Sequence, residues 1–339
     1  MNILVTGGVG FIGSHVCVKL LELGHKVIVI DNLSNSHFSS LQNVAKIVNT
    51  SLNIDGNLNF FHGDIRDQDP LEEIFSNYNV DVVIHLAGLK SVKDSVENPE
   101  KYYSNNVNGS INLFNLMEKF DCKTIIFSSS ATVYGATNKM PISEKAEILP
   151  INPYGMNKKN IEDILMNLFN IDDSWHISIL RFFNPIGAHK SGLIGESPLA
   201  LPNNLMPYIL KVASGELKKL NIFGDDYDTH DGTGVRDYIH VEDLAAGHIK
   251  ALDDVINKPQ VIIANLGTGI GYSVYDVIRT FEKVTHQKIF FEVSERRLGD
   301  IASSYSDPAF AKKALDWVAS YNLEDMCNDA WNYKLKNIL

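Results

Sequence analysis

The chain has 339 residues, of which 45% are hydrophobic and 21% are charged, which is typical of a globular protein large enough for two lobes. A formal net charge of −11 without a run of Lys or Arg argues against nucleic-acid binding, and no apolar stretch reaches the roughly 18 residues that a membrane helix needs. Three cysteines, Cys17, Cys122 and Cys327, lack metal or disulfide spacing, so we expect no metal site and a reducing, cytoplasmic location.

Short apolar runs rich in β-branched residues alternate with helical patterns along most of the chain. The strands are predicted at 2–6, 26–30, 58–62, 81–86, 123–129, 176–182 and 261–267. The helices are predicted at 12–23, 40–48, 70–77, 99–119, 154–170, 204–214, 273–285, 308–316 and 323–336. This alternation indicates an α/β fold, a doubly wound parallel sheet with helices on both faces.

The composition of the sequence changes after residue 184. The run "FFNPIGAHKSGLIGESP" is rich in Gly, Pro and Ser and reads as a long functional loop, and "FGDDYDTHDGTGVRDYIH" is also loop-like. We therefore predict a dinucleotide-binding domain over residues 1–184, to which 237–268 returns. Residues 185–236 and 269–339 would form a smaller C-terminal α/β substrate lobe.

The chain opens with "NILVTGGVGFIGSH", a strand, a glycine-rich turn and a helix. Gly7, Gly10 and Gly13 would allow a tight turn, the close approach of a pyrophosphate and close helix–strand packing. The following helix N-terminus offers free N–H groups to the phosphates. Asp31 ends the second strand, where an acid can bond the ribose of NAD and repel the 2′-phosphate of NADP. The order of these features predicts NAD rather than a purely structural turn.

Two further strand ends carry residues that would face the cofactor. Asp64 and Ile65 follow one strand, and Ala87, Gly88 and Lys90 follow the next. In open parallel sheets, ligands bind outside the carboxyl ends of the strands.

The stretch "NPYGMNK" places Tyr154 and Lys158 four residues apart near a predicted helix start, so both side chains can share one face. A nearby cation favours a phenolate and would lower the pKa of the tyrosine. By itself this pair could equally be an ordinary exposed aromatic and cation. Ser130 at the end of "IIFSSS" adds a third polar group at the same edge of the sheet.

With these residues in place, the chain resembles the extended short-chain dehydrogenase/reductase family, which combines a strand-end Ser with Tyr-x-x-x-Lys behind an N-terminal G-x-x-G-x-x-G. The resemblance implies that Tyr154 transfers a hydroxyl proton, that Lys158 holds the nicotinamide ribose and lowers the tyrosine pKa, and that Ser130 bonds the reacting oxygen. It also implies further NAD contacts from Phe11, Ile12, Asn32, Asn105, Ser128 and Phe183.

Longer segments, among them "SSSATVYG", "NNVNGS", "RFFNPIGAH", "PNNLMPYI", "GTGVRDYIHVEDLA" and "RRLGD", resemble the members of this family that epimerise UDP-hexoses at C4. The resemblance implies reversible interconversion of UDP-glucose and UDP-galactose through a 4-keto sugar, with NAD retained. The implied UDP-sugar contacts are Lys90, Ser130, Tyr154, Asn184, Asn203, Asn204, Leu205, Asn221, Phe223, Arg236, Arg297, Asp300 and Ser304. Arg236 and Arg297 can fork onto the two phosphates, although loop arginines can also be mere solvation.

Three other functions are compatible with a chain of this fold class. Nucleotide-sugar dehydratases of this family carry Asp-Glu directly after the strand-end Ser or Thr, where this chain has Ala131 and Thr132. Uronic-acid epimerases and decarboxylases stay open, though "NNLMP" and "GTGVRDY" favour a neutral hexose. A catalytically idle NAD-binding regulator would not need Ser130, Tyr154 and Lys158 together.

Two finer expectations follow from the resemblance. Ser304 stands four residues after Asp300, where a small side chain admits an N-acetyl group, so UDP-GlcNAc and UDP-GalNAc should also react; a shift by one residue would put Tyr305 there instead. Helices 99–119 and 154–170 would build a homodimer contact. Its candidate apolar residues, some of which must face the sheet, are Val107, Ile111, Leu113, Leu116, Ile164, Leu165 and Leu168.

Overall fold

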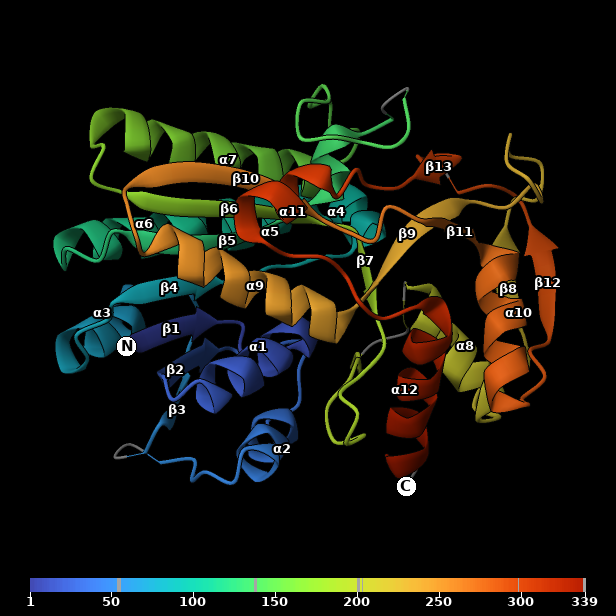
Figure 1. Ribbon diagram of the computed structural model, residues 1–339, viewed down its shortest axis with the longest axis horizontal. Coiled ribbons are helices and arrows are strands. Elements are labelled where there is room, and N and C mark those ends of the chain that lie inside the picture. Colours follow the sequence, from blue (N-terminus) through green and yellow to red (C-terminus); the bar gives the residue numbers. More distant parts are fainter. Residues whose placement is uncertain (54–55, 137–138, 200–201, 203, 298, 338–339) are drawn as a thin grey trace.

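The computed structural model describes residues 1–53, 56–136, 139–199, 202, 204–297 and 299–337, and its main feature is a parallel sheet (Figure 1). Within these residues the sheet has seven strands in the order β10-β6-β5-β4-β1-β2-β3. The strands are β1 Asn2–Thr6, β2 Lys26–Asp31, β3 Leu58–His62, β4 Val82–His85, β5 Thr124–Ser130, β6 His176–Phe182 and β10 Gln260–Leu266. The predicted doubly wound sheet is thus confirmed.

Helices cover both faces of this sheet (Figure 1). The helices α1 (Phe11–Glu22), α2 (Ser39–Ile47) and α9 (Val241–Val255) pack on one face, in a core that includes Val5, Val29 and Leu180. The helices α3 (Gln68–Asn77), α6 (Gly109–Lys119) and α7 (Pro153–Ile171) pack on the other face, with Leu4, Ile28 and Ile179. Successive strand residues point to opposite faces, so strands covered on both sides are apolar throughout.

The predicted helix 99–119 is interrupted. It consists of α5 (Pro99–Tyr102), a π-helical turn η1 (Tyr103–Asn108) and α6, and it follows the short helix α4 (Val92–Glu97). The turn contains the sequence "SNNVN", and asparagine is a poor helix former because its side chain competes for backbone groups. Such π turns occur frequently at functional sites.

A second, smaller group of elements lies beyond the strand ends (Figure 1). Four short strands, β7 (Asn184–Ile186), β9 (Val235–His240), β11 (Gly271–Ser273) and β13 (Ser303–Ser304), form one sheet in the described chain. The strands β8 (Leu220–Phe223) and β12 (Phe291–Ser294) form another. The helices α8 (Leu205–Ala213), α10 (Val274–Thr285) and α12 (Leu323–Lys336) share a core with Ile222 and Tyr238. The sequence analysis predicted none of these six strands, and it interpreted the segment that contains β9 as a loop.

The division into two domains stays a prediction. Strand β10 pairs with β6 in the large sheet although it follows the substrate-lobe residues in sequence. Helix α11 (Ala309–Leu315) and Trp317 pack into the core with α9, on the large sheet rather than with α10 and α12. The predicted boundary at residue 269 does not anticipate this return.

The apolar residues expected at a dimer contact lie mostly in the core. Val107, Leu113, Leu116 and Leu165 are buried, and Ile164 and Leu168 pack against the same core. Only Ile111 of that set is exposed. The buried residues face the sheet, as expected for some of this set, because both helices also cover the sheet and that face needs apolar side chains. The homodimer contact stays a prediction.

Candidate functional site

The glycine-rich turn lies between β1 and α1 and leaves room for a ligand. Gly7 has φ +71°, and a Cβ there would lie 2.8 Å from the Ala87 backbone nitrogen. A Cβ on Gly13 would meet the Gly7 carbonyl oxygen at 2.3 Å, so this glycine packs the helix onto the turn. A Cβ on Gly10 would approach only the Gly7 oxygen, at 3.2 Å, which leaves its outer side open. The three glycines therefore occupy the three positions that a bound pyrophosphate requires.

The first turn of α1 is suited to phosphate. Gly10 is its N-cap without a capping side chain, and the turn contains no acidic residue. Phe11 and Ile12, both predicted to contact NAD, are the first two residues of the helix and are half-buried. Free N–H groups and the positive end of the helix dipole thus face the turn. This helix start fits the phosphates of a dinucleotide.

Asp31 and Asp64 end two neighbouring strands beside this turn. The Asp31 carboxylate accepts hydrogen bonds from Val9 N (3.1 Å) and Leu33 N (2.9 Å). Asn32 Nδ2 donates to Asp64 Oδ2 at 2.8 Å, and Arg66 holds the same carboxylate and lowers the pKa of Asp64 to about 2. Asp64 is therefore anionic at neutral pH, and two backbone N–H groups fix the Asp31 carboxyl group at the end of its strand.

The loop after β4 is fixed by an asparagine that the sequence interpretation did not single out. Asn106, buried in the π turn, accepts a hydrogen bond from Leu89 N (2.8 Å) and donates to Leu89 O (3.0 Å). The predicted NAD contact Asn105 donates to the same Asn106 oxygen at 2.9 Å. A Cβ on Gly88 would lie 3.3 Å from this oxygen and 3.9 Å from Lys158 Nζ. The π turn thus fixes the position of the Gly88 loop relative to Lys158.

Ser130, Tyr154 and Lys158 are all buried and lie together at the ends of β5 and α7. Lys158 Nζ donates to the Ser128 carbonyl oxygen at 2.7 Å and lies 5.9 Å from the centre of the Tyr154 ring. Ser130 Oγ accepts hydrogen bonds from Thr132 N (3.3 Å) and Thr132 Oγ1 (3.0 Å). Thr132, which stands where dehydratases of this family carry an acidic residue, therefore orients the serine.

The electrostatics of this cluster differ from the sequence expectation. Burial raises the pKa of Tyr154 to about 12, and a hydrogen bond from Ser130 opposes that rise. Burial lowers the pKa of Lys158 to about 8, and the Glu162 carboxylate opposes that fall. The protein alone thus favours a protonated tyrosine, because the loss of solvation exceeds the effect of its neighbours. A further positive charge beside the phenol would be needed to make it a base.

Other predicted NAD contacts line the same edge of the sheet. Ser128 is buried, and its hydroxyl donates to His248 Nε2 at 3.0 Å, since His248 Nδ1 bonds the Leu244 carbonyl. Phe183 and Ile65 are buried, so any contact with a ligand is limited to the face that they leave open. These residues shape the wall rather than supply charge.

Two predicted contacts with the UDP-sugar share one carboxylate. Lys90 Nζ pairs with Glu196 Oε1 at 2.9 Å, and Asn204 Nδ2 donates to the same oxygen at 3.0 Å. Glu196 lies in the long loop after β7 and was not predicted, although it belongs to the Gly- and Ser-rich stretch that marked this loop as functional. Asn203 lies outside the described residues.

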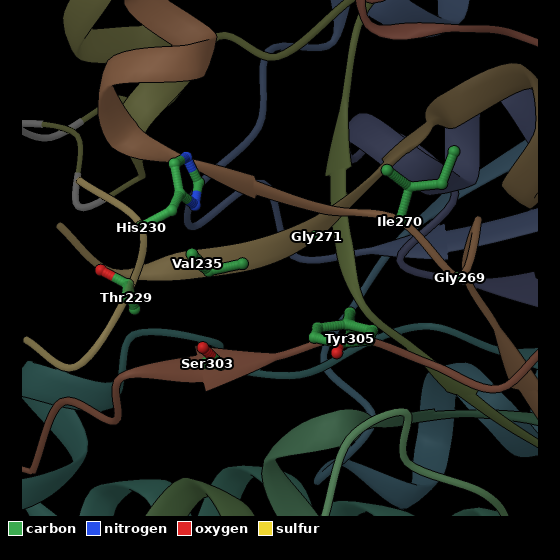
Figure 2. A pocket seen from close by; sticks show the side chains of 8 residues that line it. All are labelled: Thr229, His230, Val235, Gly269, Ile270, Gly271, Ser303 and Tyr305. Carbon is green, nitrogen blue, oxygen red and sulfur yellow. The ribbon is translucent and has the colours of Figure 1, made fainter. Parts of the chain in front are cut away.

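Strand pairing settles which way the segment 303–305 faces. Ser303 pairs with Val235 and Ser304 pairs with Arg236, and paired residues lie on the same face of a sheet. Ser303, Tyr305 and Val235 line a hollow of about 410 Å³ together with Thr229, His230 and Gly269–Gly271 (Figure 2). Ser304 therefore lies on the opposite face, with Arg236, and Tyr305 does not share that face.

The remaining predicted substrate residues spread over the second group of elements. The Arg297 guanidinium lies 3.8 Å from the centre of the Phe223 ring, which places a cation and an aromatic face together. Arg236 Nη1 donates to its neighbour's carbonyl, Val235 O, at 2.8 Å. Asn184, Asn221 and Asp300 are exposed, and Leu205 begins α8. The three exposed residues offer polar groups that a ligand can reach.

One group of possible metal ligands lies beside the hollow in Figure 2, where the sequence predicted none. His230, Asp231 and Asp276 bring one ligand atom each within 4.8 Å of one another. The Asp231 carboxylate accepts a hydrogen bond from Ser273, and Arg279 pairs with both Asp231 and Asp276, so protein groups already bind the two acids. Within the described residues, no helix is both long and apolar enough to cross a membrane.

A dinucleotide-type glycine turn on a doubly wound sheet, with a buried serine, tyrosine and lysine at its edge, defines an extended short-chain dehydrogenase/reductase. Residues 4–330 match a family described as GDP-mannose 4,6 dehydratase. The UDP-glucose 4-epimerase of Bacillus subtilis is 48% identical over 338 residues, covering 100% of this chain and 98% of that protein. The one from Haemophilus influenzae is 50% identical and covers 99% and 98%.

A solved structure, UDP-glucose 4-epimerase from Bifidobacterium longum in complex with NAD⁺ and UDP, superposes with a TM-score of 0.95 at 46% identity and 99% coverage of both chains. The chain belongs to the UDP-glucose 4-epimerase family.

Proposed function

We infer that this protein is an NAD-dependent UDP-glucose 4-epimerase that interconverts UDP-glucose and UDP-galactose in galactose metabolism. The observation that carries this inference is the buried Tyr154, hydrogen-bonded to Ser130 and one helical turn from Lys158. Lys158 Nζ lies 3.9 Å from the position of a Cβ on Gly88, next to the Ala87 backbone that borders Gly7. The full-length similarity to curated epimerases supports the same reaction.

In this mechanism Tyr154 takes the proton from the sugar O4 and later returns it. Ser130, held by Thr132, bonds the reacting oxygen and orients it toward the phenol. Lys158, whose Nζ lies 5.9 Å from the centre of the Tyr154 ring, would stabilise the phenolate once the proton has left and would hold the cofactor ribose. The glycine turn and Asp31 would hold NAD, which would supply a reversible hydride acceptor for C4 of the sugar.

A dehydratase is the first alternative, since the matched family model carries that name. Elimination of water needs an acid–base pair next to Ser130, but Ala131 has no titratable group and the Thr132 hydroxyl is bonded to Ser130. The residues therefore favour an enzyme that returns its hydride without elimination.

The nucleotide must be gripped while the hexose turns over. Arg236 and Arg297 would bind the diphosphate, and Phe223 would pack beside the base. Among the residues proposed for the sugar pocket, Lys90 already pairs with Glu196, so a sugar carboxylate would have to compete with that anion. This pairing favours a neutral hexose over a uronic acid.

We also propose that UDP-GlcNAc and UDP-GalNAc are substrates. Ser304 shares a face with Arg236, the proposed phosphate ligand, and its small side chain leaves space next to the sugar. The bulky Tyr305 lines the hollow of Figure 2 instead. The strand register thus supports Ser304 as the residue beside the sugar C2 group.

The protein is further proposed to form a homodimer. Met156 on α7, Ile111 on α6 and Tyr103 in the π turn are 52%, 37% and 47% exposed, which is high for apolar side chains on neighbouring helices. A second copy of this chain would cover them. The three cysteines are buried and unpaired, which supports the cytoplasmic location predicted from the sequence.

The test is turnover by the purified protein, with sugar nucleotides separated after incubation. Conversion of UDP-galactose to UDP-glucose, and of UDP-GlcNAc to UDP-GalNAc, is expected. UDP-glucuronic acid serves as the control for a carboxylated sugar and should be left unchanged. Formation of a 4-keto-6-deoxy sugar, or no turnover of UDP-galactose with NAD present, would refute the assignment.

A further inference from the structure

Helix α7 carries a buried acid that the proposed mechanism does not use. Glu162 and Arg181, each 4% exposed, form a forked ion pair with Oε2 2.6 Å from Nη2 and Oε1 3.0 Å from Nε. Charged groups are rarely buried unless they are paired, and removing one partner of such a pair is strongly destabilising. The position of this pair suggests more than stability.

Glu162 lies on the same face of α7 as the catalytic groups, one turn after Lys158 and two turns after Tyr154. The Ser129 hydroxyl donates to Glu162 Oε1. Ser129 stands in β5 between Ser128, whose carbonyl accepts the Lys158 hydrogen bond, and the catalytic Ser130. One carboxylate therefore ties α7 to β5 between the two strand residues that contact Lys158 and Tyr154.

Arg181 is fixed on the far side of this carboxylate. It lies in β6 directly beside Ser129, and its Nη1 donates to the Tyr134 hydroxyl at 3.1 Å. The Tyr134 hydroxyl in turn donates to Asn265 Oδ1 at 2.7 Å. The guanidinium is thus held toward η2 (Ala131–Tyr134) and β10, while the carboxylate remains on the side of Lys158.

Glu162 is the anionic group among the titratable neighbours of Lys158. Among the described residues, the titratable groups that face the ammonium are Tyr154 and Glu162 from α7 and His85 from β4. The pKa of His85 is lowered to about 3 by burial, so it is neutral, and β5 contributes the Phe127 ring 4.8 Å away. Glu162 raises the pKa of Lys158 against burial, which has lowered it to about 8.

We propose that Glu162, oriented by Arg181, is a positioning residue of the reaction: it keeps the Lys158 ammonium charged and holds the end of β5 in register with the catalytic face of α7. This inference rests on the proposed function, because it acts through the role of Lys158. The hydrogen bond from Ser129 holds β5 in register with α7, and the negative charge of Glu162 stabilises the charged form of Lys158. The two contributions can be separated by different substitutions.

The first test is the pH–rate profile of Glu162→Gln, which keeps the shape and removes the charge. The alkaline limb of kcat should move to lower pH by about one unit. Turnover at pH 7 should fall only severalfold, because part of the Lys158 population loses its charge there. Glu162→Asp restores the negative charge on a side chain that is one methylene shorter. The alkaline limb of its kcat profile should therefore return toward that of the parent protein. Its turnover should stay low, because the shorter side chain does not hold β5 in register. A limb that does not move in Glu162→Gln would overturn the electrostatic role.

Ser129→Ala is the second test and leaves the ion pair in place. It should lower kcat severalfold with KM for UDP-galactose and the alkaline limb unchanged, because only the link between β5 and α7 is lost. Parent-like turnover would overturn the positioning role, even if the Glu162 variants fail to fold. An inactive parent protein would refute the proposed function and this inference with it, whereas an active parent with an unshifted Gln variant refutes the inference alone.

Discussion

Burial decides the chemistry open to Tyr154 at the scale of single residues. The loss of solvation raises its pKa to about 12, so at neutral pH the protein by itself holds a phenol rather than a phenolate. In the proposed mechanism, Lys158 and the ring of bound NAD⁺ would supply the compensating positive charge. We therefore expect the base to form only in the complete complex, which protects the site from idle proton transfer.

Substitution of Tyr154 by Phe tests this role. The fold and NAD binding should persist, because the phenyl ring fills the same space, but turnover should fall by roughly two to four powers of ten. Turnover of UDP-galactose and the retention of NAD after gel filtration are the measurements. The control is Tyr103→Phe in the π turn, which should remain active. Near-normal activity of Tyr154→Phe would remove this residue from proton transfer.

At the scale of elements, the two-residue strand β13 contains Ser304, the residue proposed to admit N-acetylated substrates. Its pairing with β9 assigns Ser303 and Ser304 to opposite faces, and a slip of one residue would exchange them. The sequence placed Ser304 near the sugar but left Tyr305 as an alternative. Only the register, which depends on the hydrogen bonds of the folded lobe, distinguishes the two.

Replacing Ser304 by Tyr should abolish turnover of UDP-GlcNAc and largely spare UDP-galactose, because a bulky ring would occupy the space of the acetamido group. The ratio of kcat/KM for the two substrates is the measurement. Tyr305→Phe is the matched control, since its side chain lines the hollow on the other face, and it should leave the ratio unchanged. A Tyr305 variant that alters the ratio, with Ser304→Tyr silent, would reverse the assignment.

How far the sequence predicted each element depends on the element's length. Long buried strands such as β5 and β6 were placed within a residue or two, because continuous apolar runs between turn residues have few other interpretations. The helix α9 and the π turn were missed, the first because its apolar face is interrupted by Glu242, Asp243 and His248, all buried through specific partners. The role of Asn106 and Glu162 depends on contacts between distant segments, which periodicity does not encode.

On the scale of the whole molecule, the exposed apolar surface of α6 and α7 predicts a dimer. The double variant Ile111→Glu and Met156→Glu should be monomeric at micromolar concentration, because burying two carboxylates in the contact is unfavourable. Sedimentation velocity is the measurement. Phe290→Glu, at a residue 64% exposed in the second group of elements, is the control and should leave the parent dimer intact. A parent protein that sediments as a monomer would contradict the prediction.

Buried histidines make the stability of the molecule sensitive to acid. Burial lowers the pKa of His15 and His248 to about 4 and that of His85 to about 3. Between these values and 6.5 the unfolded chain binds more protons, so the free energy of unfolding rises with pH and is lost on acidification. Each histidine contributes about 1.4 kcal/mol per pH unit in that window.

Urea unfolding between pH 7.5 and 5 measures this slope. His248→Gln should show a shallower slope than the parent, whatever its stability at pH 7.5, because one titrating group is gone. His37→Gln, at an exposed histidine, is the control and should keep the parent slope. Equal slopes in the parent and in His248→Gln would mean that the buried imidazole does not titrate on unfolding.

The position of β10 late in the sequence also affects how the protein folds during synthesis. While the chain is being synthesised, β6 stands at the edge of the sheet, paired with β5 on one side, and its outer hydrogen-bonding groups stay unpaired until residue 266 has left the ribosome. An apolar strand with an open edge readily pairs with another chain. Newly made molecules are therefore most prone to aggregation during this interval, when chaperones would have to shield them. Truncation before β10 would leave a product that aggregates rather than a smaller working domain.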